Sequence, residues 1–453
     1  MCLYVSRNSP YTENEKERGK KGADFNFFSF FHTYLLSQPD INRIIDSKRD
    51  YIQKIVYSFT LSKYNVLENN KRVKFILEIY LDNSATTRVC PEAAAAAMSV
   101  MTDAYGNPSA VHSFGVRAKA VLENSRRMLA DALGADPSEI YFSHSGTLAN
   151  NTAIFGAVNA RKKMGNRIVT TKLEHPSVAR CMDILEEQGF QVIRLSPSED
   201  GTFRPEELLN AINKNTILVS CMLVNNETGA INPVELISRA VKRVSAPALI
   251  HVDAIQGFGK IPVKPSKMGI DLLTVSGHKV HGPKGVGALY VRKNLNIKPV
   301  IFGGGQENGL FSGTEALPAI AGFAAAVNAF PNIQRQHEET KRIRDYLLSL
   351  IRNNPRIHIN SPADAVPNII NMSVTGIPSQ VLINFLSERG IYVSAGSACK
   401  KGHRSEVLSA LGVPSHLIDS AIRVSLSRYT TTEEIEIFVA SLNDAINSIR
   451  TKL

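Results

Sequence analysis

The sequence lacks several features that define whole classes of protein. It contains no tryptophan, and its five cysteines (Cys2, Cys90, Cys181, Cys221 and Cys399) are widely spaced, with no CxxC pair. An odd number of scattered cysteines argues against a disulfide framework and against a tetrahedral zinc site, so we expect no metal. The same cysteine usage is typical of a reducing compartment, and we expect a cytoplasmic protein.

The chain also lacks an apolar run long enough to cross a membrane. The nearest is FNFFSFFHTYLL, residues 25–36, which is interrupted by polar residues and is shorter than the roughly 20 residues that a spanning helix needs. Glu13, Glu15 and Glu17 precede it, which neither a secretory signal nor a transit peptide favours. We therefore expect no membrane partner.

Basic residues outnumber acidic ones, which gives a formal net charge of +11. Such an excess raises the question of nucleic-acid binding. The lysines and arginines are, however, spread along the chain, and no zinc-finger spacing or aromatic-basic module occurs. We therefore expect no direct nucleic-acid partner.

Residues 1–78 differ in composition from the rest of the chain. They are rich in Lys, Asn, Tyr and Phe, and one stretch, INRIIDSKRDYIQKIVYSF, has some helical spacing of apolar residues. The segment is either a targeting or partner-binding extension or a non-essential appendage. We favour the second interpretation.

Between residues 79 and 330, short apolar runs alternate with helical patterns. The runs are EIYFS, RIVTT, QVIRL, TILVSCMLV, ALIHVDA, DLLTVSG and GALYVRK. Near-continuous apolar strands separated by helices predict an α/β fold with a mostly parallel sheet between layers of helices. Ligands of such sheets bind at the carboxyl ends of the strands, so the polar residues that follow these runs form the candidate site.

Residues 331–453 predict a smaller C-terminal α+β domain. Helical patterns occur in HEETKRIRDYLLSLIRN, PSQVLINFLSERG and TTTEEIEIFVASLNDAINSIR, and strand patterns occur in NIINMSV, IYVSAG and AIRVSLS. The threonines at 430–432, followed by two glutamates, indicate the start of the last helix. We therefore expect an N-terminal extension over residues 1–78, a large domain over 79–330, whose first residues are able to join the small domain, and a small domain over 331–453.

Two charged residues stand at the ends of neighbouring predicted strands. Asp253 closes one strand pattern and Lys279 follows the next. Such a pair suits pyridoxal phosphate, because a lysine forms a Schiff base with its aldehyde and a carboxylate holds its pyridine nitrogen protonated. A structural ion pair between the two side chains is the alternative, and these two residues alone do not decide.

Three further stretches favour a cofactor site. SHSGTLANN, residues 143–151, follows a strand and opens a helix, where free amides bind phosphate, although an ordinary capped helix has the same pattern. His175 follows RIVTT, where an imidazole stacks on a ring or moves protons, although a lone histidine is more often structural. Asn225 and Asn226 follow TILVSCMLV, where an asparagine bonds a ring hydroxyl or forms a turn. Each signal is weak alone, and their order along the chain carries the prediction.

At these residues the sequence resembles the cysteine desulfurase family, within the class V branch of the fold-type I pyridoxal phosphate enzymes. The resemblance extends from residue 79 to the C-terminus and is carried by YLDNSATT, YGNPSAVHSFG, TKLEHPSV, VNNETGAINP, HVDAIQGFGKIPV, SGHKVHGPKGVGALYVR, FSGTEALPAIAGF, SAGSAC and AIRVSLSRYTTTEEI. It implies a homodimeric enzyme that converts L-cysteine to L-alanine. The sulfur would pass to an acceptor protein, in iron–sulfur cluster assembly or in tRNA thiolation.

The resemblance also implies roles for single residues. Lys279 matches the Schiff-base lysine, Asp253 the carboxylate at the pyridine nitrogen, and His175 the stacking histidine and acid or base. The remaining cofactor contacts would fall on Asn226 and Gln256 at the ring hydroxyl and on Gly146, Thr147, Ser276, His278 and, across a dimer interface, Thr314 at the phosphate. Asn107 and Arg423 match the residues that hold the substrate carboxylate, for which a guanidinium group is chemically suited.

Cys399 matches the nucleophile that takes up sulfur as a persulfide. It lies in SAGSACKKGHRSEVL, residues 394–408, where glycine and serine permit the motion that carries a thiol into and out of a site. The basic residues Lys400, Lys401, His403 and Arg404 favour the thiolate, although they are also typical of a solvated basic loop.

The sequence departs from the family pattern at several positions. The loop after Cys399 is slightly shorter than in scaffold-type members, which leaves the acceptor protein open. Leu148 stands where a glutamate is common, and Asn308 and Phe311 stand where arginines are usual. We interpret these changes as weakening substrate or cofactor contacts or as marking a divergent subgroup.

Two other functions remain open. One is a different class V activity, such as a selenocysteine lyase or an aminotransferase, which needs Lys279 but not Cys399. The other is a cofactor-binding protein with weak chemistry that acts as a sulfur-transfer or regulatory partner. Cys399→Ala separates the first from a desulfurase, because retained turnover of cysteine would exclude the persulfide mechanism.

Overall fold

The computed structural model describes residues 64–69, 72–395 and 404–449. The chain separates into two compact units, residues 1–64 and 65–453, and the architecture below is that of the second. The apolar run at 25–36, the stretch with helical spacing at 41–59 and Cys399 lie outside the described residues. Within the described ranges, no helix has the length and apolarity needed to cross a membrane.

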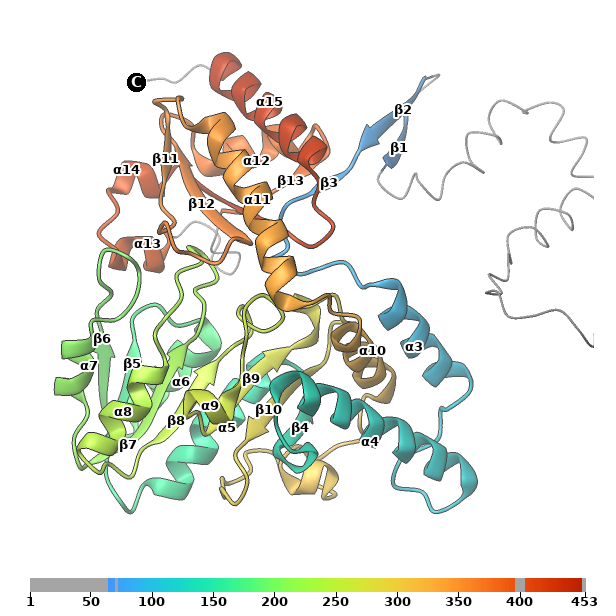
Figure 1. Cartoon of the computed structure of the whole chain (residues 1–453), viewed down its shortest axis with the longest axis vertical. Helices are drawn as coiled ribbons and strands as arrows, with labels where there is room; N and C mark the ends of the chain where they lie inside the picture. The colour runs from blue at the N-terminus through green and yellow to red at the C-terminus, as the bar shows by residue number, and fades with distance from the viewer. Residues whose placement is uncertain (1–63, 70–71, 396–403, 450–453) are drawn as a thin grey trace, which may run out of the picture. The chain divides into compact units, whose positions relative to one another are not determined.

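A seven-stranded sheet forms the centre of the larger part of this unit (Figure 1). Its strands lie in the order β4 (Ile140–Ser143), β10 (Gly287–Val291), β9 (Leu272–Ser276), β8 (Leu249–Asp253), β7 (Thr216–Met222), β5 (Arg167–Thr171) and β6 (Gln191–Leu195). All pairs from β9 to β6 are parallel, whereas β10 is antiparallel to both of its neighbours. The strands coincide with the seven apolar runs, and the predicted mostly parallel sheet is confirmed.

The side chains of successive strand residues pack in two separate apolar cores, one on each face of the sheet. Val169, Val219 and Ile250 pack in one cluster with α4 (Ser113–Leu133), α8 (Glu235–Arg243) and α10 (Leu317–Asn328). Their neighbours Ile168, Leu218 and Leu249 pack in the other with α5 (Gly146–Arg161) and α6 (Pro176–Glu187). Because both faces are covered, these strands are apolar throughout rather than alternating. The remaining helices of this part are α3 (Pro91–Thr102), α7 (Pro205–Ala211), α9 (Pro265–Met268), η2 (Pro137–Glu139), η3 (Gly277–Lys279) and η4 (Gln306–Gly309).

A second, antiparallel sheet has its own core. It contains β11 (Ile357–Ile359), β12 (Ile369–Val374) and β14 (Ala421–Ser425), and β13 (Ile391–Tyr392) pairs nearby with β3 (Ile79–Tyr80). Its helices are α11 (Ile333–Ile351), α12 (Ser379–Ser387), α13 (Glu406–Ala410), α14 (Ser415–Ile418) and α15 (Thr432–Ser448). Ile79 and Leu81 are buried in this core, although they lie far from it in sequence. The division into three parts at residues 78 and 330 stays a proposal.

A two-stranded sheet of β1 (Tyr64–Asn69) and β2 (Arg72–Leu77) completes the described elements.

The start of α15 follows the predicted capping pattern. Thr431 accepts a hydrogen bond from the backbone N–H of Glu434, and the Glu434 carboxylate accepts one from the backbone N–H of Thr431. This reciprocal pair satisfies N–H groups that have no partner within the helix. The helix packs its apolar face, including Phe438 and Leu442, into the second core.

Candidate active site

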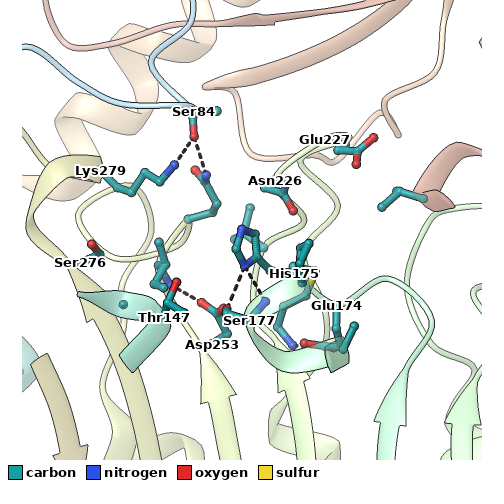
Figure 2. Close-up of a pocket in the computed structure, with 18 of the residues that line it drawn as sticks. Ser84, Thr147, Glu174, His175, Ser177, Asn226, Glu227, Asp253, Ser276 and Lys279 are labelled. Atoms are coloured by element: carbon teal, nitrogen blue, oxygen red, sulfur yellow. Dashed lines mark hydrogen bonds between the residues drawn. The ribbon is translucent and has the colours of Figure 1, made fainter. Parts of the chain in front are cut away.

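A cavity of about 750 Å³ opens at the carboxyl edge of the central sheet (Figure 2). Its walls come from the ends of β5, β7, β8 and β9, from the first residues of α5 and α6, and from β14 of the second sheet. The structure therefore brings together ten of the predicted site residues, namely Gly146, Thr147, His175, Asn226, Asp253, Gln256, Ser276, His278, Lys279 and Arg423.

Backbone carbonyl groups orient the side chain of Lys279. Its Nζ donates a hydrogen bond to the backbone oxygen of Ser84 at 2.5 Å (Figure 2). It donates a second to the backbone oxygen of Ala85 at 2.7 Å. Lys279 closes η3, directly after β9. Ser84 and Ala85, which precede Lys279 by almost two hundred positions in the sequence, thus hold its amine at the cavity wall.

Asp253, the last residue of β8, is buried below the cavity with 5% of its surface exposed. Its Oδ2 accepts a hydrogen bond from Asn150 Nδ2 at 2.8 Å, and its Oδ1 accepts one from the backbone N–H of Ile255 at 3.0 Å. Burial raises the pKa of Asp253, and these bonds together with the nearby His175 oppose the rise. A cation placed at this carboxylate would restore its charged form, because a buried charge is stable only when paired.

His175 occupies the position just before α6 and caps that helix. Its Nδ1 accepts a hydrogen bond from the backbone N–H of Ser177 at 3.1 Å and lies 2.8 Å from Ser177 Oγ (Figure 2). Because a backbone N–H only donates, Nδ1 carries no proton, and the proton of the neutral ring is on Nε2. Burial lowers the pKa of His175, which favours this neutral form.

The first turn of α5 presents free backbone N–H groups to the cavity. Ser145 caps the helix by accepting from the backbone N–H of Leu148, which leaves the amides of Gly146 and Thr147 at the helix start. Gly287 of β10 lies so close that a Cβ there would be 2.8 Å from the carbonyl carbon of Ser145 and 2.9 Å from the nitrogen of Gly146. Helix N-termini of this kind bind phosphate.

The end of β9 and the following η3 contribute Ser276 and His278 to the cavity wall. Ser276 is buried, and the half-buried His278 has its Nδ1 3.3 Å from Thr86 Oγ1. Burial, assisted by the positive charges of Lys279 and Lys284, lowers the pKa of His278 to about 4, so the ring is neutral at physiological pH.

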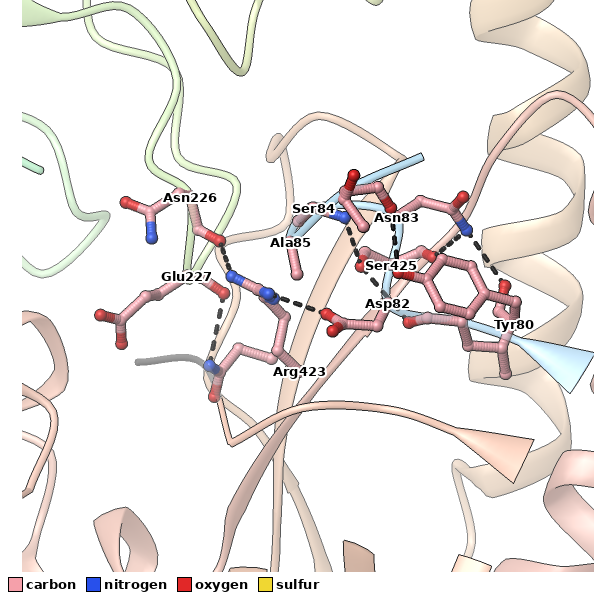
Figure 3. A network of polar contacts seen from close by, with 12 residues as sticks. Tyr80, Asp82, Asn83, Ser84, Ala85, Asn226, Glu227, Arg423 and Ser425 are labelled. Carbon is pink, nitrogen blue, oxygen red and sulfur yellow. Dashed lines mark hydrogen bonds and ion pairs between the residues drawn. The ribbon is translucent and has the colours of Figure 1, made fainter. Parts of the chain in front are cut away.

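Arg423 reaches the cavity from β14 and is almost completely buried (Figure 3). Its Nη1 donates to the backbone oxygen of Asn226 at 2.8 Å, and its Nη2 pairs with Asp82 Oδ1 at 2.9 Å. The carboxylate and the carbonyl fix the plane of the guanidinium group.

Gln256 connects the cavity to a buried lysine. Its Nε2 donates to the backbone oxygen of Ser84 at 2.9 Å, so Gln256 and Lys279 share one carbonyl acceptor. Its Oε1 accepts from Lys260 Nζ at 2.7 Å.

Two buried acids of the cavity wall were not among the predicted site residues. Glu174 accepts at Oε1 from Thr171 Oγ1 and from the backbone N–H of Met222, and burial raises its pKa to about 8. Glu227 accepts at Oε2 from Ser405 Oγ, and burial also raises its pKa. Both belong to stretches singled out in the sequence, EHPSV and NNETG, but their burial depends on partners that are remote in the chain.

Three predicted site residues are not among the cavity residues. Asn107 and Thr314 are exposed in loops, and the Asn107 side chain accepts a hydrogen bond from the backbone N–H of Ser109. Cys399 lies outside the described residues. Within the described ranges, no group of histidine, cysteine and acidic side chains has the arrangement of a metal site.

The residues that depart from the family pattern do not contact the cavity. Phe311 is 3% exposed and belongs to a buried apolar cluster against which Leu148 packs. Asn308 has a left-handed backbone with φ of 53°, a conformation that asparagine adopts more readily than most residues. Leu148 and Phe311 therefore contribute to the apolar packing beside α5, whereas Asn308 is exposed, and none of the three is among the residues that line the cavity.

Comparison with known proteins identifies the family and several relatives of this chain. Residues 79–438 match the family described as Aminotransferase class-V. "Cysteine desulfurase IscS" of Methanosarcina thermophila is 38% identical over 390 residues, which cover 85% of this chain and 95% of that protein. "Cysteine desulfurase" of Trichormus azollae is 40% identical over 377 residues, which cover 82% and 94%. The solved structure of a "NIFS-LIKE PROTEIN" superposes with a TM-score of 0.78 at 37% identity and covers 82% of this chain and all of that one.

Proposed function

Because the chain belongs to the class V aminotransferase family as a cysteine desulfurase, we propose that it converts L-cysteine to L-alanine in this cavity and takes the sulfur as a persulfide on Cys399. The observation that supports the site most strongly is the convergence of Lys279, Asp253 and Arg423 on one cavity. A reactive amine, a buried carboxylate and a guanidinium group are what amino-acid chemistry on pyridoxal phosphate requires.

The residues present fit pyridoxal phosphate, the cofactor of this family. The Asp253 carboxylate is buried and suits a protonated ring nitrogen, while the free amides of Gly146 and Thr147 suit a phosphate group. Ser276 and His278 line the same cavity and would add side-chain contacts to the phosphate. Asn226 and Gln256 would face the ring hydroxyl, with His175 over the ring.

When bound, the cofactor supplies an aldehyde that bonds covalently to amines and a ring that accepts electrons from the substrate α-carbon. The side chain of Lys279, held by the carbonyls of Ser84 and Ala85, is placed to take the α-proton and to return one to the product. Neutral His175, with its proton on Nε2, is a second donor for the same cavity.

Arg423 would hold the substrate carboxylate. Asp82 and the carbonyl of Asn226 bind its guanidinium group, which orients the group at the cavity before substrate arrives. A bidentate guanidinium–carboxylate pair then sets which bond of the substrate faces Lys279.

Cys399 would complete the reaction by attacking the sulfur of L-cysteine. The thiolate forms a sulfur–sulfur bond while the carbon–sulfur bond of the substrate breaks. The electron pair of the broken bond stays with the substrate, which takes up protons and leaves as L-alanine. The terminal sulfur of the persulfide passes to an acceptor protein, in iron–sulfur cluster assembly or in tRNA thiolation.

A second copy of the chain would supply Thr314, which is exposed and lies away from this cavity. Asn107 stays a proposed partner of Arg423 at the substrate carboxylate. The loop with Asn107 lies among exposed apolar side chains of α3, α4 and their connection, namely Met98, Met101, Tyr105, Val111, Phe114 and Val116. An apolar surface of this kind marks a protein interface. We therefore propose a homodimer, and a cytoplasmic location on the grounds of cysteine usage.

Purified protein given L-cysteine and a thiol reductant tests the proposed function. We expect alanine and sulfide in equal amounts from the wild type, and neither from Cys399→Ala with its cofactor bound. Turnover retained by Cys399→Ala would reject the persulfide mechanism and favour another class V activity. Cofactor absorbance without alanine or sulfide would reject the desulfurase activity itself.

A further inference from the structure

Lys260 is a buried lysine that contacts a residue of the cavity wall and that the reaction above does not use. It lies after β8, and 9% of its surface is exposed. Its Nζ donates to Gln256 Oε1 at 2.7 Å. Among the described residues, no carboxylate pairs with it. A buried amine without a counter-ion costs stability, which calls for an explanation.

The contacts of Gln256 determine which way its amide points. The backbone oxygen of Ser84 only accepts hydrogen bonds, so the atom of Gln256 that faces it, at 2.9 Å, is the donor Nε2. An ammonium group only donates, so the atom that faces Lys260 is the acceptor Oε1. The reverse orientation would oppose two oxygens at Ser84 and two donors at Lys260.

In this orientation the amide of Gln256 has a second N–H donor available to the cavity. Nε2 carries two N–H groups, and the carbonyl of Ser84 takes one of them. The other belongs to a side chain that lines the cavity. Gln256 thus offers an N–H, rather than an oxygen, to a group bound there.

The charges around Lys260 are consistent with this arrangement. Burial first, and then the positive charges of Lys279 and Arg423, lower the pKa of Lys260 to about 7. The neighbouring imidazoles of His278 and His281 are neutral at physiological pH, because burial lowers the pKa of each to about 4. The amine of Lys260 keeps N–H groups in both its charged and its neutral form, so it remains a donor to Gln256 across this range.

We propose that Lys260 is a positioning residue, which fixes the amide of Gln256 so that an N–H faces the hydroxyl oxygen of the bound cofactor ring. This inference rests on the proposed function, in which Gln256 contacts that oxygen. It adds a role for a residue that does not itself touch the cofactor. Together with the carbonyl of Ser84, the hydrogen bond from Lys260 keeps a donor rather than an acceptor of Gln256 towards an ionised ring oxygen.

Holoenzymes of the wild type, Lys260→Met, Gln256→Leu and the double variant test the proposal. The readouts are the dissociation constant and the absorbance maximum of the bound cofactor, with thermal unfolding measured alongside. For Lys260→Met we expect roughly ten-fold weaker cofactor binding and a shifted absorbance maximum, because a buried acceptor loses a charge-assisted bond. For the double variant we expect no further loss beyond Gln256→Leu, because Lys260 acts through Gln256.

Two further variants separate this role from a structural one. Lys260→Gln keeps one donor and should show a smaller loss, and it replaces Lys260→Met if that variant does not fold. Lys267→Met, on the exposed face of α9, should match the wild type.

Unchanged cofactor affinity and absorbance in Lys260→Met would overturn the proposal, as would equal losses of affinity from Lys260→Met in the wild-type and Gln256→Leu backgrounds. Failure of the proposed contact between Gln256 and the cofactor gives a different result, because Gln256→Leu alone would then leave cofactor binding unchanged. Failure of the desulfurase activity alone would leave the expected affinities of all four proteins as they stand.

Discussion

At the scale of single residues, buried titratable groups set the chemistry of the cavity. Asp253 and Glu174 are both carboxyl groups at its floor, yet they differ in their surroundings. Asn150 and the N–H of Ile255 support a charge on Asp253, whereas one oxygen of Glu174 is buried with no hydrogen-bond partner in the described structure. Asp253 is thus suited to pair with a cation, and Glu174 to remain a neutral donor.

Glu174 should make the stability of the protein depend on pH. The folded protein holds the carboxyl proton up to about pH 8, whereas the unfolded chain releases it near 4.5. Between these values the folded state binds more protons, so rising pH favours the unfolded state, by at most about 1.4 kcal/mol per pH unit. Glu174→Gln, which resembles the protonated acid, should therefore gain stability relative to wild type from pH 5 to pH 8.

Urea unfolding of both proteins across that range measures the effect. Glu187→Gln, at an exposed glutamate of α6, is the matched control and should follow the wild type. Parallel stability curves for Glu174→Gln and wild type would show that Glu174 is ionised in the folded protein.

At the scale of elements, the site depends on how closely β10 approaches the start of α5. Gly287 of β10 faces the backbone of Ser145 and Gly146, and no side chain fits between them. Because neither backbone is free to move without distorting the sheet, the glycine fixes the position of the helix N-terminus relative to the strands.

Gly287→Ala should therefore displace the first turn of α5. We expect a stability loss of roughly 1–3 kcal/mol from overpacking and weaker binding of the cofactor phosphate, measured by thermal unfolding and by cofactor titration. Gly189→Ala is the control, because its added Cβ meets nothing within 4 Å although its backbone has φ of 91°. It should lower stability through backbone strain and leave cofactor affinity unchanged. Wild-type affinity in Gly287→Ala would contradict the role given to this contact.

The elements were more predictable from the sequence than the contacts of the site. The seven apolar runs locate the strands of the central sheet, and the order of polar residues after them locates the cavity. Ser84 and Glu227 were missed because they act through remote partners, Ser84 holding Lys279 and Glu227 holding Ser405. Nothing in a local pattern indicates such pairs, since they form only when separate segments fold together.

Local packing accounts for two of the departures from the family pattern, Leu148 and Phe311, and nothing in the structure explains the third, Asn308. Phe311 and Leu148 belong to one apolar region beside α5, so the loss of charged residues at the two positions is consistent with burial. The prediction that these changes weaken cofactor or substrate contacts, or mark a divergent subgroup, stays a prediction.

At the scale of the whole molecule, one cavity is built from two sheets with separate cores. Lys279 and Asp253 follow strands of the central sheet, whereas Arg423 comes from β14 of the second. The segment that includes β3 joins the second core, which links the beginning of the family region to its end. Relative placement of the two sheets therefore sets the distance between the substrate carboxylate and the reacting amine.

Two deletions of different length should distinguish the part of the N-terminal segment that the fold does not need from the part, including β3, that it does. Deletion of residues 1–63 should leave activity and thermal stability close to wild type, because the second core begins with Leu77, Ile79 and Leu81. Deletion of residues 1–81 should abolish folding, since each lost buried side chain costs about 2–5 kcal/mol. An inactive or insoluble protein after deletion of residues 1–63 would show that the extension has a function.

The proposed dimer should depend on the apolar surface around Asn107. Met101→Lys and Val111→Lys place charges among exposed apolar side chains, and we expect a larger fraction of monomer and lower activity on dilution. Sedimentation over a range of protein concentrations measures this effect. Ile437→Lys, on the exposed side of α15, should remain a dimer. An unchanged assembly in both surface variants would place the interface elsewhere.

Mass spectrometry after a single turnover tests the central claim most directly. The holoenzyme is mixed with one equivalent of L-cysteine without reductant, and its peptides are compared with those of an untreated sample. We predict one added sulfur atom on the peptide that contains Cys399, an equal amount of L-alanine, and loss of the added mass on reduction. L-Alanine formed with no added sulfur on Cys399, or with the sulfur on another cysteine, would contradict the account.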